Sequence, residues 1–116
     1  MALLGYQAES EDFTDPGQGI QGRFIAGPGP RIELLIQTDG SSVLEPWLAK
    51  GVKAYHYGYE VERLDAELER LKAAGGIVVT APRPAVAFAG RRISFVMLRN
   101  LFLVELIEAG QAERTP

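Results

Sequence analysis

The chain has no cysteine, which excludes a disulfide framework, a thiol nucleophile and a thiolate metal site. It also has no concentrated run of basic residues, since 12 Lys and Arg face 15 Asp and Glu and the net charge is −3. Nucleic acid is therefore not an expected partner, because phosphate binding needs a concentrated basic face. No apolar run approaches a membrane span, and the N-terminal MALLGYQAESED lacks the basic flank of a secretory signal. We expect a cytoplasmic protein with no nucleic-acid or membrane partner.

What the chain does have suits one ordinary folded domain. It contains 116 residues, of which 47% are hydrophobic, enough for a continuous core. Gly/Pro-rich stretches separate apolar runs, and this pattern predicts two hairpins, two helices and a short strand. The hairpins are predicted at 23–26 with 31–37 and at 92–98 with 101–107, the helices at 43–50 and 62–74, and the short strand at 77–80, before Pro82 and Pro84. The predicted fold class is α+β.

Residues 53–61 alternate in a way that predicts a strand with two different faces. One face carries His56, the only histidine, between the small residues Ala54 and Gly58. The other face carries three tyrosines, which we expect to pack against the helix that follows. We expect Asp65 to be the N-cap of that helix.

An internal repeat is visible in which a strand leads through a turn into an apolar strand with one embedded acid. The first copy runs from GRFIA at 22–26 to IELLI at 32–36, and the second from RISFV at 92–96 to VELI at 104–107. Short apolar strands also resemble one another by chance, so the repeat is a moderate signal. A true repeat would place Glu33 and Glu105 at related positions.

Glu105 is the most informative single residue. It lies between Val104 and Leu106 in LFLVELI, a strand that is apolar on both faces. An unpaired carboxylate there is costly, so it should be paired, bound to a metal, protonated or facing a wet cavity. The alternative is an edge acid that simply reaches solvent. Glu33 is a milder case, for which an exposed strand face with an Arg31–Glu33 pair is equally consistent.

His56 is a candidate ligand because its small neighbours leave open volume around the imidazole. A lone histidine is more often structural than a ligand, so both readings stay open. One imidazole and two carboxylates on three different strands suit a divalent ion such as Co, Mn, Ni, Fe or Zn. We therefore predict His56, Glu33 and Glu105 as the metal ligands.

These segments resemble the vicinal-oxygen-chelate superfamily of glyoxalases and bleomycin-resistance proteins, and within it the methylmalonyl-CoA epimerase branch. The segment 55–109, with HYGYEVERLDAELERLKAAGG near its start and FLVELIEA at its end, is similar to the second βαβββ module of those proteins. RIELL at 31–35 and VLEPWLAKG at 43–51 resemble the end of the first module and its linker. The likeness covers nearly the whole chain and is weak before Gly17.

The resemblance implies paired βαβββ modules that form a curved, incomplete barrel around a cavity. It places His56, Glu33 and Glu105 on three of the family's four metal-ligand positions. It also implies a metal-dependent epimerase or isomerase that acts at the carbon α to a carbonyl, as in an acyl-CoA or other acyl thioester. Glu105 would move the proton, and Glu9 or Glu11 lies in the region that supplies a second catalytic base.

The chain departs from the family at its start, where the first strand, first helix and first histidine ligand have no counterpart. We expect a single domain over 1–116, made of a partial first module (1–42), a linker (43–52), a second module (53–109) and a tail (110–116). The edge left beside 31–37 predicts a homodimer through that strand. Two alternative functions remain: a non-catalytic small-molecule-binding or resistance-type module, and a subunit whose site another chain completes.

Overall fold

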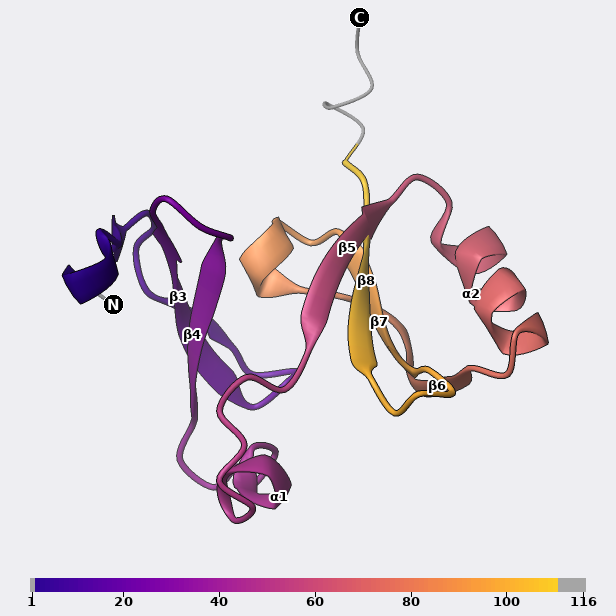
Figure 1. Ribbon diagram of the computed structural model, residues 1–116, viewed down its shortest axis with the longest axis horizontal. Helices are drawn as coiled ribbons and strands as arrows, with labels where there is room; N and C mark the ends of the chain where they lie inside the picture. Colours follow the sequence, from indigo (N-terminus) through magenta and orange to yellow (C-terminus); the bar gives the residue numbers. More distant parts are fainter. Residues whose placement is uncertain (1, 111–116) are drawn as a thin grey trace, which may run out of the picture. The chain divides into compact units, whose positions relative to one another are not determined.

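The computed structural model describes residues 2–110 and divides the chain into two compact units, Met1–Val52 and Lys53–Pro116. Each unit is built on one open four-stranded sheet, and the fold class is α+β, as the sequence predicts (Figure 1). Within residues 2–110 no helix is both long enough and apolar enough to span a membrane.

The first unit is an antiparallel sheet arranged around one long strand. In chain order it contains a 3-10 turn at Ala2–Leu4, β1 (Gln7–Ala8), β2 (Phe13–Asp15), β3 (Ile20–Ala26), β4 (Ile32–Gln37) and α1 (Glu45–Leu48). β3 pairs with β1 and β2 along one side and with β4 along the other. The predicted first hairpin is therefore confirmed, with a longer first strand, and the predicted short helix is present over fewer residues.

The second unit has the order βαβββ. It contains β5 (Tyr57–Val61), α2 (Leu64–Ala73), β6 (Ile77–Pro84), a 3-10 turn at Val86–Phe88, β7 (Arg92–Met97) and β8 (Leu103–Glu108). The sheet order is β5-β8-β7-β6, with β5 parallel to β8 and the other pairs antiparallel. The long connection through α2, β6 and β7 is what allows the parallel pair, because parallel strands cannot be joined by a tight turn.

The internal repeat predicted from the sequence is present in the strand register. Phe24 of β3 lies opposite Glu33 of β4, and Phe95 of β7 lies opposite Glu105 of β8. Each embedded acid therefore occupies the same position of its hairpin, across from a phenylalanine on the same face of the sheet.

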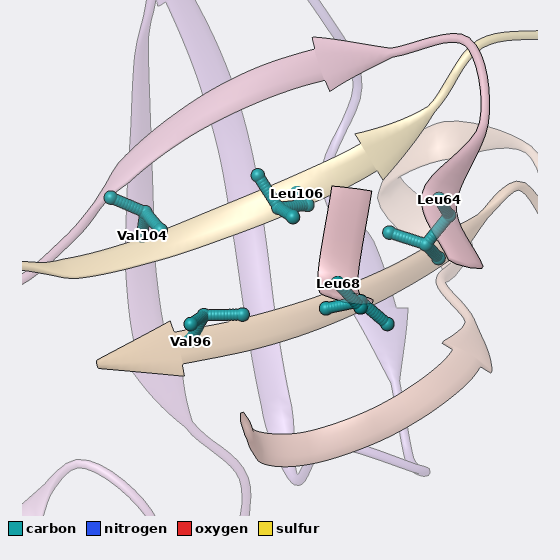
Figure 2. Close-up of a cluster of buried hydrophobic side chains, with 5 residues drawn as sticks. All are labelled: Leu64, Leu68, Val96, Val104 and Leu106. Atoms are coloured by element: carbon teal, nitrogen blue, oxygen red, sulfur yellow. The ribbon is translucent and has the colours of Figure 1, made fainter. Parts of the chain in front are cut away.

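The core of the second unit lies between α2 and the sheet. Leu64 and Leu68 of α2 pack against Val96 of β7 and against Val104 and Leu106 of β8 (Figure 2). The leucines recur at helical spacing while the strand residues alternate, so both elements direct their apolar side chains into one layer. The opposite face of β8 is then free to carry a different set of side chains, including Glu105.

Leu64 is completely buried, and its truncation should destabilise the second unit strongly. We expect Leu64→Ala to lower the free energy of unfolding by about 2–5 kcal/mol, because it removes buried methyl groups and leaves a cavity. Leu101, which is 79% exposed, provides the matched control. Leu101→Ala should change the free energy by less than about 0.5 kcal/mol in the same urea titration. Equal effects would show that the packing in Figure 2 is wrong.

Three local predictions are wrong. Tyr57 and Tyr59 are not buried against the helix, since they are 62% and 54% exposed. The reason is that α2 packs on β6, β7 and β8 and does not cover β5. Asp65 is not the N-cap, since Arg63 holds that position without a side-chain cap and Asp65 bonds Arg92 instead. β6 does not end at residue 80 but continues through Pro82 to Pro84, which an edge strand tolerates.

The predicted homodimer would form through β4, at the edge of the strand that does not face β3. Among residues 2–110 only β3 pairs with this strand, and Leu34 and Ile36 on one of its faces are 47% and 62% exposed. If β4 is the contact, Leu34→Lys should dissociate the dimer without unfolding the chain, because the substituted side chain is already at the surface. Sedimentation at micromolar concentration should give twice the chain mass of 12.6 kDa for the original protein. A single species at the chain mass would rule the dimer out.

Candidate active site in the second unit

Glu105 lies on one face of the second sheet beside a layer of apolar side chains, which we call the apolar floor. On β8 this face carries Glu105 and Ile107, and on β7 it carries Phe95 and Ile93, their partners in the register. Ile93 and Ile107 are buried with Ala85, and Phe88 and Phe95 pack against them. We call this side of the sheet the Glu105 face. It places one carboxylate beside apolar side chains, an environment that strengthens any electrostatic contact the carboxylate makes.

His56 meets Glu105 on this face. The imidazole Nε2 lies 3.2 Å from Oε1 of Glu105, and the two side chains are only 11% and 6% exposed. The contact arises because His56 directly precedes β5, which runs parallel to β8 with Tyr57 opposite Val104 and Gly58 opposite Glu105. The prediction that the strand begins at residue 53 and includes His56 is therefore wrong, since β5 begins at Tyr57, but the imidazole still lies beside the carboxylate of Glu105.

Two aromatic rings fix the orientation of the imidazole. Tyr55 contacts it edge-on with ring centroids 4.4 Å apart, and Phe95 does the same at 5.0 Å. Such edge-to-face contacts hold a ring in place without taking up its nitrogen atoms. Phe95 was not identified from the sequence. The sequence feature that could have identified it is the internal repeat, in which Phe95 belongs to the strand that pairs with the strand of Glu105.

The chemistry of the pair fits a divalent cation. The nitrogen of His56 that faces Glu105 is Nε2, while Nδ1 is buried and has no hydrogen-bond partner within residues 2–110. The second oxygen of Glu105 also makes no hydrogen bond within that range. Two ligand atoms held at a right angle, each about 2.1 Å from an ion, lie roughly 3 Å apart, close to the separation seen here. His56 and Glu105 can therefore act as adjacent ligands of one ion.

The other predicted site residues lie in the first unit. Glu33 is half-buried on β4, and its place in the ligand set stays a prediction. Glu9 is exposed and forms an ion pair with Arg31, whose guanidinium lies 3.8 Å from the ring centroid of Phe24. Glu11 is also exposed. The roles of Glu9 and Glu11 as catalytic bases likewise stay predictions.

Glu108, on the same strand as Glu105, serves a structural purpose. Its two carboxylate oxygens accept hydrogen bonds from Arg92 at 3.0 and 2.8 Å, and Arg92 also donates to Asp65 in the first turn of α2. The hydrogen bonds that Arg92 donates to Glu108 and to Asp65 raise the pKa of its guanidinium further above the ordinary value. The acids at 105 and 108 therefore have different partners, although they are only three residues apart.

Comparison with known proteins identifies relatives of this chain. Residues 1–95 match the sequence profile of the glyoxalase/bleomycin resistance protein/dioxygenase superfamily. An ethylmalonyl-CoA/methylmalonyl-CoA epimerase of Cereibacter sphaeroides is 33% identical over 96 residues, which are 79% of this chain and 72% of that protein.

Two solved structures have the same fold. The methylmalonyl-CoA epimerase of Mycobacterium tuberculosis matches 97% of this chain and 77% of its own, with 28% identity and a TM-score of 0.74. A hypothetical protein of Bacillus halodurans matches 91% of this chain and 78% of its own with a TM-score of 0.75, and at 19% identity it supports the fold alone. The chain belongs to the glyoxalase/bleomycin resistance protein/dioxygenase superfamily.

Proposed function

We propose that this protein is a metal-dependent epimerase or isomerase that acts at the carbon α to a carbonyl, with an acyl thioester as substrate. The observation that carries the proposal is the buried contact between His56 and Glu105, which brings a metal-ligating imidazole to a carboxylate. The similarity of the chain to an ethylmalonyl-CoA/methylmalonyl-CoA epimerase and to a methylmalonyl-CoA epimerase favours this reaction over others in the superfamily.

The chain's own part in the reaction is a proton transfer. A carboxylate oxygen of Glu105 takes the proton from the α carbon, the C–H bond breaks, and its electron pair moves to the thioester carbonyl to give an enolate. Return of a proton to the opposite side of that carbon inverts its configuration, so reactant and product contain the same atoms. The apolar floor of Ile93 and Ile107 keeps water away from the carboxylate during the transfer.

A divalent ion held by His56 and Glu105, with Glu33 as a proposed third ligand, would supply the positive charge that stabilises the enolate oxygen. The aromatic contacts from Tyr55 and Phe95 keep the imidazole in a fixed orientation for this task. A second base is needed for inversion, and Glu9 and Glu11 are the proposed candidates.

The main alternative is a binding module of the same fold that holds a small molecule without chemistry. One observation favours it: the guanidinium of Arg31 already engages the carboxylate of Glu9, one of the two candidates for the second base. If this alternative is correct, the protein binds its ligand but does not exchange the α proton.

Deuterium exchange separates the two functions. Methylmalonyl-CoA is incubated with the protein in deuterated water, with Co²⁺ or with a chelator, and loss of the α-proton signal is followed by NMR. We expect exchange far above the spontaneous rate with the metal and little with the chelator. Exchange that is no faster than without protein, in the presence of metal, would contradict the proposed function.

A further inference from the structure

Gly58 lies inside β5 at a point where the backbone does not require glycine. β5 pairs with β8 in unbroken parallel register from Tyr57 to Val61, so there is no bulge to explain it. Gly58 is also not among the residues with positive φ. A glycine inside a regular strand lowers stability and often marks a place where a ligand approaches closely.

Packing within the described chain does not require glycine at this position either. A Cβ atom at residue 58 would lie 3.3 Å from Cδ1 of Ile107 and 3.9 Å from Oε1 of Glu105. Apart from the adjoining residues of its own strand, no other atom of residues 53–110 comes within 4 Å of that point. The closer contact is the end of a flexible side chain, so an alanine fits with a small shift of Ile107.

The space left open by Gly58 therefore adjoins the carboxylate group of Glu105. A proton passes to a carboxylate only from an atom within about 3 Å of it, or slightly more. A group attached to that atom then lies roughly one bond length further from the oxygen. The Cβ atom of a side chain at residue 58 would lie in the same distance range, at 3.9 Å from the carboxylate of Glu105.

We propose that this space receives the substituent on the α carbon of the substrate, so that residue 58 sets the size of substituent the site accepts. The proposal rests on the proposed function for the identity of the reacting atom. The end of Ile107 forms one wall of the space, so the substituent on this side is a small alkyl group rather than a charged one.

The test is equilibrium binding, measured by calorimetry with methylmalonyl-CoA and ethylmalonyl-CoA in the presence of Co²⁺. These two thioesters differ by one methylene on the α carbon, a difference worth about 10-fold to 200-fold in a fitted apolar pocket. We expect Gly58→Ala to weaken ethylmalonyl-CoA binding roughly tenfold more than methylmalonyl-CoA binding, and Gly58→Val to weaken the binding of both.

Thermal unfolding provides the second measurement, because the proposal predicts stability and binding to move in opposite directions. Gly58→Ala should raise the Tm by about 1–5 °C, since alanine restricts the unfolded chain and suits a strand better than glycine. The control is Ala81→Val, which adds bulk to an exposed residue of β6 in the same sheet. It should leave the affinities for both thioesters unchanged.

The outcomes are distinct. An unchanged affinity ratio in Gly58→Ala, an equal loss in Ala81→Val, or no binding of either thioester to the original protein would each overturn the proposal. A lower Tm in Gly58→Ala would do the same, because glycine would then be required by the fold. Size-dependent binding without α-proton exchange would defeat the proposed function and leave this inference standing.

Discussion

Replacing Glu105 with glutamine is expected to lower the rate of α-proton exchange by about 10²–10⁴-fold while the protein stays folded. The amide keeps the volume of the side chain and can still accept a hydrogen bond from Nε2 of His56. It cannot take a proton from carbon, and it no longer contributes negative charge to a bound ion. The measurement is the exchange rate by NMR, with circular dichroism to verify the fold.

Glu108→Gln is the matched control, because it makes the same chemical change three residues along the same strand. This substitution weakens the contacts with Arg92 and should reduce stability modestly, while the exchange rate stays within about threefold of the original. Equal exchange rates in Glu105→Gln and in the original protein would remove Glu105 from the mechanism.

His56→Ala is expected to weaken the binding of Co²⁺ or Mn²⁺ by at least about 100-fold. Loss of a group that merely supports a metal ligand costs 10-fold to 100-fold in affinity, so loss of the ligand itself should cost at least as much. A metal ion that binds only the folded protein also raises its Tm. Calorimetric titration gives the affinity, and the Tm with and without metal gives an independent reading.

Tyr57→Ala is the control for this substitution. Tyr57 directly follows His56 in the chain, but its side chain is 62% exposed on the other face of β5. Its truncation should leave both the metal affinity and the metal-dependent rise in Tm unchanged. Metal affinity that is preserved in His56→Ala would show that the imidazole only packs between Tyr55 and Phe95.

The sequence predicts the positions of the strands and helices better than it predicts which part of the sheet a helix covers. The hairpins and α2 follow from periodicity and turn residues, which act locally. The same periodicity shows that Tyr57 and Tyr59 share a face, yet it carries no information on how far α2 reaches across the sheet. The extent of β6 was missed for a similar reason, since Pro82 is compatible with a strand only if that strand lies at an edge.

The candidate site combines local and distant information. Glu105 is conspicuous because a charge inside an apolar strand needs a partner, and this argument requires only the sequence around it. Its contact with His56 joins residues 49 positions apart. The residue types suggested that the two side chains share one site, but no local pattern specified the parallel pairing of β5 with β8 that brings them together. Phe95 and Gly58 carry no charge, so their importance emerges only from their positions beside the imidazole and the carboxylate.

The central claim is that His56 and Glu105 form a centre for a divalent metal ion. The most direct test is to dialyse the protein against Co²⁺ or Mn²⁺, remove free metal, and measure the bound metal by atomic emission. We expect about one ion per chain in the original protein and much less than one in His56→Ala and in Glu105→Ala. Retention of no metal by the original protein, or the same amount in all three proteins, would contradict the account.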